Sequence, residues 1–324
     1  MTAENTRPNE VVQQSILGEY PQLRNGRLSV KTRFQSSDKS RFYNTYLVES
    51  SHPGFERFVA KGSAHARFRE KELGTEWRAL NLLQSHEGPS PALLIPDHVP
   101  QTFLLMEYIE GRPAAEVILS KGDRAETFFQ TGKEAGRVHS IPAPGFGSLH
   151  SDFDDNWVTY FDGKMRERFS DVRGILPDNV VRNLQGIYES HAEVLEEDSP
   201  KSPVLVQRDM HFDNFIMKAD TGEAALIDFS YAAGGRPLSD LGRLYVQDFY
   251  QFPDYKDTFL QGYQQFIPLP ENFEVLMKIY TMSTALGMVY MANAVGRTND
   301  IAYPTNILID LANGTGLITE LLQA

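Results

Sequence analysis

The sequence predicts an α+β protein of two lobes, a smaller one built on an antiparallel sheet and a larger one that is mostly helical. Two observations support this class. Residues 27–108 contain short runs with the alternation of strands, and the chain after residue 110 is patterned mainly as helices. A polar turn at residues 110–113 separates the two patterns. We therefore predict an N-terminal lobe over residues 1–110 and a C-terminal lobe over residues 111–324.

The strands of the first lobe follow from alternating or continuous apolar runs after a polar lead-in and a short helix at residues 11–17. A helix is expected at residues 66–83, because Trp77, Leu80 and Leu83 recur at helical spacing. A polar loop at residues 35–41 can close a hairpin. The strands are expected at residues 27–34, 42–48, 58–61 and 102–108.

In the second lobe, residues 125–140 are amphipathic and end before Pro142, which stops a helix. Residues 282–296 form an apolar run of 15, too short to cross a bilayer and typical of a buried helix. Two short apolar runs, at residues 204–206 and 224–227, are each followed at once by polar side chains. Those two strand ends are where we expect the chemistry.

The amino-acid composition limits the classes of partner and of functional site that are expected. The chain has 31 Lys and Arg against 43 Asp and Glu, a formal net charge of −12. This balance argues against nucleic acid and anionic membranes as main partners. It is compatible with a cationic small molecule, or simply with solubility. The absence of cysteine excludes disulfides, thiolate zinc sites and cysteine nucleophiles. The polar residues 1–10 lack the plan of a signal peptide, so a cytoplasmic location is expected.

The most informative residues are Asp209, Asn214 and Asp228. An aspartate, an asparagine five residues later and a second aspartate after an apolar strand match the catalytic template of kinases. In that template Asp209 would accept the proton of the acceptor hydroxyl, and Asn214 and Asp228 would bind Mg²⁺. These residue types suit the task, because Mg²⁺ prefers hard oxygen ligands and a carboxylate can orient a hydroxyl.

The remainder of the template is expected upstream. Lys61 ends a predicted strand and would bind the α- and β-phosphates, while Glu76 on the next helix would pair with Lys61. The loop at residues 35–41 would cover the phosphates. The base of the nucleotide would bond to backbone atoms of the connecting segment at Glu107 and Ile109. The predicted cofactors are therefore ATP, or GTP, and Mg²⁺.

Taken together, these segments resemble the aminoglycoside phosphotransferase and choline-kinase-like family over roughly residues 25–320. Members usually show His-Gly-Asp-x-His-x-x-Asn and Ile-Asp-Phe, a histidine at a helix end and a further downstream aspartate. The matching positions are Asp209, His211 and Asn214, Ile227-Asp228-Phe229, Ala135 to His139, and Gly235 to Asp240. The resemblance implies a bilobal protein-kinase-like fold with a nucleotide and two Mg²⁺ in the cleft. It also implies that His211 braces the catalytic loop and that His139 and Asp240 are structural.

The chain departs from the family pattern at Gln207 and Arg208, where a histidine and a glycine are usual. The change removes a bracing histidine and puts a cation beside Asp209. Arg208 either keeps Asp209 ionised or forms a salt bridge with a different acidic residue. The predicted phosphate loop also lacks the glycine pattern of protein kinases, and their Ala-Pro-Glu element is missing. A small-molecule acceptor is therefore expected in place of a protein.

Several functions stay open. An antibiotic such as an aminoglycoside is the first expected acceptor, since an acidic protein suits a polycation. A metabolic kinase of an amino alcohol, a sugar or a homoserine-like compound is the alternative. Arg208 raises a rival of another class, a nucleotide-binding pseudokinase, and a metal-dependent phosphohydrolase is a third. The acidic residues 151–155 fit equally an acceptor pocket or an exposed loop.

Overall fold

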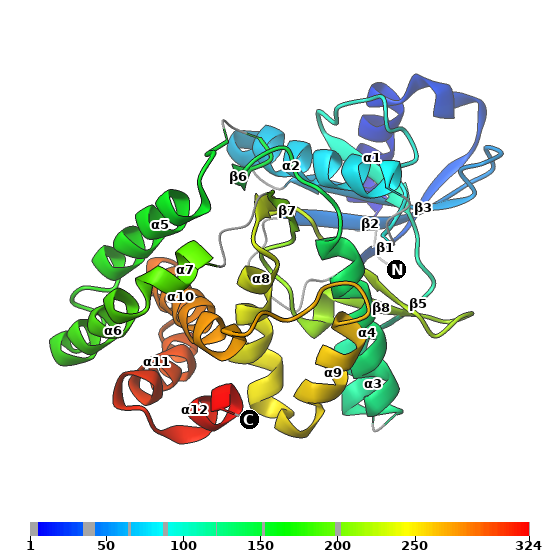
Figure 1. Cartoon of the computed structure of the whole chain (residues 1–324). Helices are drawn as coiled ribbons and strands as arrows, with labels where there is room; N and C mark the ends of the chain where they lie inside the picture. Colours follow the sequence, from blue (N-terminus) through cyan, green and yellow to red (C-terminus); the bar gives the residue numbers. More distant parts are fainter. Residues whose placement is uncertain are drawn as a thin grey trace. The chain divides into compact units, whose positions relative to one another are not determined.

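A computed structural model describes residues 6–34, 43–63, 66–86, 90–120, 122–150, 153–197 and 202–323. The chain divides into two compact units, residues 1–110 with 227–231, and residues 111–226 with 232–324 (Figure 1). The first contains a four-stranded antiparallel sheet and the second is mainly helical, so the predicted α+β class is confirmed. The loop predicted at residues 35–41 lies outside the described residues.

The sheet of the first unit has the order β1-β2-β3-β4. Its strands are β1 (Leu28–Phe34), β2 (Tyr43–Ser50), β3 (Arg57–Ser63) and β4 (Phe103–Glu107). Helix α1 (Thr6–Glu19) and the 3₁₀ turn η1 (Pro21–Asn25) precede it, and α2 (Ala66–Ser85) follows β3 and packs against it. Alternation along β3 puts Phe58 and Ala60 in the core with Val48 and Leu105, which leaves Lys61 on the opposite face of the sheet.

The helices of the second unit pack on one another. Its helices are α3 (Ala114–Leu119), α4 (Arg124–His139), α5 (Trp157–Asp171), α6 (Asp178–Ser190), α7 (Ala192–Glu197), α8 (Pro237–Leu244), α9 (Lys256–Tyr263), α10 (Phe273–Ala294), α11 (Thr298–Asn313) and α12 (Gly316–Gln323). Shorter turns are η2 (Phe212–Asn214), the π-helix η3 (Tyr245–Phe249) and η4 (Pro253–Tyr255). Strands of two small sheets contact α3, α4 and α8.

The loops predicted to hold the catalytic and metal-binding residues are connected to strands of the two small sheets. One has the order β6-β10-β7, formed by β6 (Gly147–Ser148), β10 (Ala233–Gly235) and β7 (Val204–Val206). The other has the order β5-β8-β9, formed by β5 (Gly111–Pro113), β8 (Phe215–Lys218) and β9 (Ala224–Leu226). Asp209 lies in the loop after β7, Asn214 immediately precedes β8, and Asp228 follows β9 by two residues.

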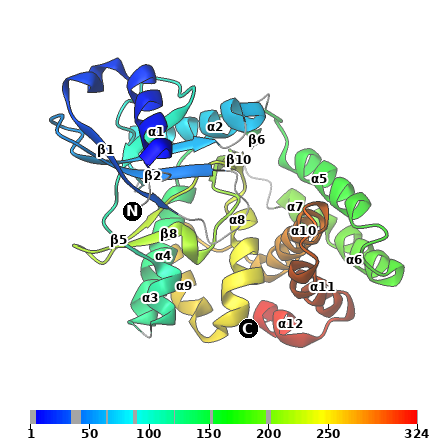
Figure 2. The ribbon, with the colours of Figure 1, turned by 180° about the vertical axis from the view of Figure 1, so that it is seen from behind.

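Helix α10 is longer than the 15-residue helix predicted at residues 282–296, because it begins at Phe273 and spans 22 residues. Its length and apolar composition alone would let it cross a membrane. In the structure it packs against α5, α8 and α11, and 61% of its most apolar window is buried (Figure 2). This burial is typical of the core helix of a globular domain.

Candidate active site

Lys61 is the centre of a buried charged cluster in the first unit. Its Nζ lies 2.7 Å from Glu76 Oε2 and 2.9 Å from Asp228 Oδ1. Lys61 and Glu76 are 5% and 1% exposed, whereas the Asp228 side chain keeps 35% of its surface exposed. Sequence reasoning predicted all three residues, and the structure brings them together.

Ser230 completes this cluster and had no predicted role. Its hydroxyl accepts a hydrogen bond from Lys61 Nζ at 2.9 Å and donates one to Glu76 Oε2 at 3.1 Å. The backbone N–H of Phe229 donates to Glu76 Oε1 at 3.2 Å. Asp228 adopts a left-handed conformation, with φ at 61°, which is uncommon for a residue with a side chain. Such strain concentrates at functional sites.

The charge state of each group in the cluster depends on burial and on the opposite charges beside it. Burial by itself would favour neutral Lys61, but Asp228 and Glu76 outweigh it and raise the pKa of the ammonium group. Burial likewise opposes the ionisation of Asp228, yet Lys61 and Ser230 lower the pKa of that carboxyl. For Glu76, burial dominates and raises the pKa. A charged lysine thus faces an ionised, partly exposed carboxylate.

The segment predicted to contact the nucleotide base follows β4. The N–H of Glu107 donates to the carbonyl of Ala92 at 2.8 Å, so a base contact at Glu107 would have to use its carbonyl oxygen. At Ile109, no hydrogen bond engages the backbone N–H or carbonyl among the described residues. The Arg57 guanidinium lies 4.2 Å from the centre of the Tyr108 ring and steadies this segment. Ile109 is therefore the better suited of the two predicted contacts.

In the second unit, Asp209 lies between two cations. Arg243 Nη2 is 3.5 Å from Asp209 Oδ1, and His211 Nε2 is 3.6 Å from Asp209 Oδ2. The Asp209 side chain is 37% exposed. The amide nitrogen of Asn214 donates to the Asp209 carbonyl at 3.0 Å, which leaves the Asn214 amide oxygen to act as an acceptor or a metal ligand.

Gln207 takes over the bracing that a histidine was expected to supply. It is fully buried, and its side-chain oxygen accepts the N–H of Asp209 at 3.0 Å. Asp240 accepts the N–H groups of Gln207 and Arg208 at 2.5 and 2.7 Å. His139 Nε2 lies 3.2 Å from the same carboxylate. Asp240 therefore ties the catalytic loop to α8, and His139 supports Asp240 from α4, as the resemblance implied.

His211 also braces this loop. Its Nδ1 lies 3.6 Å from Asp213 Oδ2, so the ring stands between two carboxylates. Burial opposes a charge on His211, but Asp209 and Asp213 outweigh burial and raise the pKa of the imidazole to about 9. The resulting imidazolium and the Arg243 guanidinium place two cations beside the Asp209 carboxylate.

The backbone conformation at Arg208 explains why glycine is usual at this position in the family. Its φ is 68°, in the left-handed region, where a residue with a side chain costs about 1–2 kcal/mol. The side chain does not pair with Asp209, whose cationic partner from outside the loop is Arg243. Among the described residues no carboxylate lies within ion-pair distance of the Arg208 guanidinium. That side chain instead lines a pocket of the second unit.

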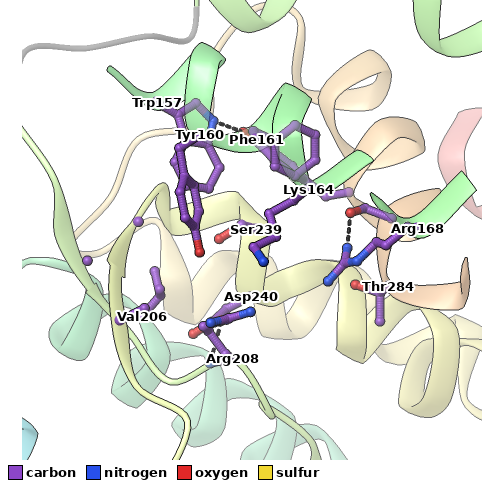
Figure 3. A pocket seen from close by; sticks show the side chains of 15 residues that line it. Trp157, Tyr160, Phe161, Lys164, Arg168, Val206, Arg208, Ser239, Asp240 and Thr284 are labelled. Atoms are coloured by element: carbon purple, nitrogen blue, oxygen red, sulfur yellow. Dashed lines mark hydrogen bonds between the residues drawn. The ribbon is translucent and has the colours of Figure 1, made fainter. Parts of the chain in front are cut away.

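This pocket has a cavity volume of about 100 Å³ (Figure 3). One wall is aromatic, and the Trp157 indole N–H donates to the Tyr280 hydroxyl at 3.1 Å. Side-chain hydroxyl groups add polar contacts. The aromatic members are Trp157, Tyr160, Phe161 and Tyr280, and the smaller hydroxyl side chains are Ser239, Ser283 and Thr284.

The charged side chains of the pocket are mainly cationic. Lys164 and Arg168 come from α5, Arg208 from the catalytic loop and Asp240 from α8. Burial, followed by the nearby charge of Arg208, lowers the pKa of Arg168 to about 10. Of the acidic residues 151–155, Ser151 and Asp152 lie outside the described residues. Asp154 and Asp155 are exposed and do not line this pocket.

Sequence reasoning missed Ser230, Arg243, Lys164 and Arg168. Ser230 directly follows the Ile227-Asp228-Phe229 motif, which was a usable signal. Lys164 and Arg168 are four residues apart on one helix, a like-charge spacing that disfavours the isolated helix and could have marked a binding site. Arg243 carries no local signal, because only the packing of α8 brings it near Asp209.

Comparisons with known proteins agree with these motifs. The sequence profile of the phosphotransferase enzyme family matches residues 37–276. Among curated proteins, no sequence matches the chain. Solved structures match over nearly the whole chain, at low identity. A candidate fructosamine-3-kinase from Thermobifida fusca has a TM-score of 0.66 and 20% identity, over 96% of this chain and 99% of that one.

Two aminoglycoside phosphotransferases are similar in the same way. A thermostable mutant of APH(4)-Ia, in a ternary complex with ADP and hygromycin B, has a TM-score of 0.64 and 14% identity, covering 94% of this chain and 99% of that one. The gentamicin complex of APH(2″)-IIa has a TM-score of 0.63 and 17% identity, covering 99% of both chains. These matches establish the protein-kinase-like fold. The profile match covers well over half of the sequence, and the chain belongs to the phosphotransferase enzyme family as a small-molecule kinase.

Proposed function

We propose that this protein transfers the γ-phosphoryl group of ATP, or GTP, to a hydroxyl group of a small molecule. The observation that carries the proposal is the Lys61 cluster, in which a buried ammonium group touches both Glu76 and Asp228. A buried lysine held between two carboxylates from distant parts of the sequence is the arrangement that kinases use to bind phosphates. Nucleotide complexes of the similar APH(4)-Ia structure support the same assignment.

The donor groups also fit Mg²⁺. Asp228 is ionised and partly exposed, and the Asn214 amide presents an oxygen because its nitrogen is already a donor. One carboxylate and one amide oxygen suit an ion that keeps several waters. Asn214 and Asp228 would hold the metal, which neutralises charge on the phosphates when bound.

The chain's own groups account for the rest of the reaction. Lys61 binds phosphate oxygens, and Glu76 with Ser230 keeps it oriented. Asp209 accepts a hydrogen bond from the acceptor hydroxyl, whose oxygen attacks the γ-phosphorus while the bond to the nucleoside diphosphate breaks. The hydroxyl proton passes to Asp209 late in this step. Positioning and charge neutralisation supply most of the rate.

Replacement of Asp209 tests the assignment. Asp209→Asn keeps the shape of the side chain but removes the base, so turnover should fall by about 10²–10⁴-fold while Mg·ATP affinity changes little. Turnover can be followed as ADP release with a panel of hydroxyl compounds, and affinity by calorimetry with a non-hydrolysable analogue. Equal losses in turnover and nucleotide affinity would contradict the role of Asp209. Binding without turnover in the wild type, across the panel, would favour the pseudokinase.

For the acceptor, an aminoglycoside was the first expectation from the acidity of the whole chain. The pocket that includes Arg208 of the catalytic loop is lined by three cations, Lys164, Arg168 and Arg208, which would repel a polycationic acceptor. They favour the second candidate, a metabolic kinase, and within it the homoserine-like acceptors, which carry a carboxylate. Gentamicin or hygromycin B, offered beside homoserine in the same ADP-release assay, distinguishes the two candidates.

A further inference from the structure

We infer that the acceptor is a small hydroxyl compound with an acidic group, and that Lys164, Arg168 and Arg208 bind this group. The inference rests on the proposed kinase function and specifies the class of its substrate. The acidic group is a carboxylate or a phosphate. Arginine and lysine bind both of these anions through charge-assisted hydrogen bonds.

The three cations come from two separate segments and line one cavity. In Figure 3, Lys164 and Arg168 extend from α5 on the side of the cavity opposite Arg208 and Asp240. The Arg168 guanidinium donates to the Ser283 hydroxyl, a neutral partner. Arg168 thus has its position set by a hydrogen bond and its charge left for another group.

Within the described part of the chain, the lining of the cavity contains three cationic side chains and a single carboxylate. Asp240 is its only acidic lining residue there, and both Asp240 oxygens already accept N–H groups from Gln207 and Arg208. Glu167 pairs with Lys164 at 2.8 Å but does not line the cavity. Arg168 and Arg208 therefore face one carboxylate whose oxygens are engaged, while Lys164 also pairs with Glu167. Arg168 is half-buried with a neutral hydrogen-bond partner, so a bound anion would relieve the unfavourable burial of its charge.

Two locally unfavourable features of these cationic residues also indicate a bound ligand. Lys164 and Arg168 are like charges at positions i and i+4, which destabilise a helix. Arg208 occupies a left-handed position that glycine would adopt without strain. Lys164 pairs with Glu167 and the Arg208 N–H donates to Asp240, but among the described residues no carboxylate lies within ion-pair distance of the Arg168 or Arg208 guanidinium. Costs of this kind are typical of residues retained for binding.

The location and size of the cavity fit an acceptor. Arg208 is directly followed by Asp209, so an acid bound at Arg208 would hold the remainder of a small molecule near the catalytic carboxylate. A cavity of about 100 Å³ is smaller than the roughly 300–1,000 Å³ typical for drug-sized ligands. It suits one acidic group against the aromatic wall better than a multi-ring polycation.

The test uses thermal unfolding of the full chain in saturating Mg·ADP, so that the sites for the α- and β-phosphates of the nucleotide are filled. Inorganic phosphate or acetate is titrated at constant ionic strength, adjusted with sodium chloride. We expect one or both anions to raise the Tm of the wild type in a saturable manner. Arg168→Gln and Arg208→Gly should each weaken the apparent anion affinity about tenfold or more. The two anions show whether a phosphate or a carboxylate is preferred.

Arg166→Gln is the matched control. Arg166 lies on the same helix, pairs with Asp162 at 2.7 Å and is 80% exposed outside the cavity. This variant should respond to anions as the wild type does. Arg208→Gly should fold at least as well as the wild type because glycine relieves the backbone strain, so the test does not depend on Arg168→Gln alone.

Some outcomes would overturn the inference. These are a wild type that neither anion stabilises beyond sodium chloride, cavity variants that respond like Arg166→Gln, or efficient phosphorylation of gentamicin by the wild type. Failure of the kinase assignment has a different signature, because Mg·ADP alone would then not raise the Tm.

Discussion

At the scale of single residues, Glu76 shows how a buried ion pair can serve a site. It is 1% exposed and contacts Lys61, Ser230 and the N–H of Phe229. Glu76→Gln removes the charge but keeps the shape. We expect a loss of about 1–3 kcal/mol in the free energy of unfolding, because buried hydrogen bonds to a charged group are broken. The kcat/KM for ATP should fall as Lys61 loses its orientation.

Chemical denaturation and ATP-dependent kinetics check this prediction. Glu116→Gln provides the control, because Glu116 is a 61% exposed helix residue with a partner 3.7 Å away. That exposed pair contributes little. A Glu76→Gln protein as stable and as active as the control would contradict the structural role of Glu76.

His211 predicts a pH dependence at the same scale. Its pKa is about 9 in the folded protein, above the ordinary value of 6.5. The folded state therefore holds the proton more tightly than the unfolded chain. The stabilisation by protonated His211, up to about 3 kcal/mol, is complete below pH 6.5 and disappears as the pH rises through 9.

The comparison of wild type with His211→Gln isolates this effect. The difference in Tm between them should be largest below pH 6.5 and should shrink towards zero above pH 9, measured by thermal unfolding in a series of buffers. A constant difference across this range would mean that His211 is neutral in the folded protein.

At the scale of elements, α4 and α9 show how closely two helices can approach. A Cβ at Gly132 would lie 2.0 Å from the carbonyl oxygen of Phe259, and one at Gly262 would lie 2.1 Å from that of Phe129. Backbone meets backbone here, so no side chain can move aside. This contact fixes the end of α4, where His139 supports Asp240.

Gly132→Ala should therefore destabilise the protein by about 1–3 kcal/mol or more through overpacking, seen as a lower Tm. Gly186→Ala is the matched control, because α6 leaves nothing within 4 Å of a Cβ at that position. There alanine should stabilise the helix by about 0.5–1 kcal/mol. Equal effects of the two substitutions would mean that α4 and α9 are not in close contact.

At the scale of the whole molecule, binding of the proposed cofactors should appear as a single stabilisation. Mg·ATP at 100 times its Kd should add about 2.7 kcal/mol to the free energy of unfolding, because it binds only the folded chain. ATP with excess chelator should stabilise less. In Asp228→Asn the added effect of Mg²⁺ should largely disappear. Thermal unfolding with each combination measures this, and identical shifts with and without Mg²⁺ would contradict the metal role.

Net charge also belongs to this scale, and the acceptor that it suggests differs from the one proposed from the pocket. The chain carries −12 overall, yet the pocket beside the catalytic loop is lined by Lys164, Arg168 and Arg208. Long-range charge affects solubility and encounter, whereas the charges within a few ångströms of a ligand determine which ligand binds.

Alternation, helical period and motif spacing are local properties of the chain. They were therefore enough to predict the fold class, the order of most elements and the charged residues of the Lys61 cluster. Lys61, Glu76 and Asp228 could be predicted to meet since their template is ordered along the chain. Three features depend on packing: Arg208 does not pair with Asp209, Arg243 lies beside Asp209 instead, and α5 supplies two more cations to the pocket. These contacts join residues distant in sequence, and packing and backbone conformation set them, so no local pattern records them.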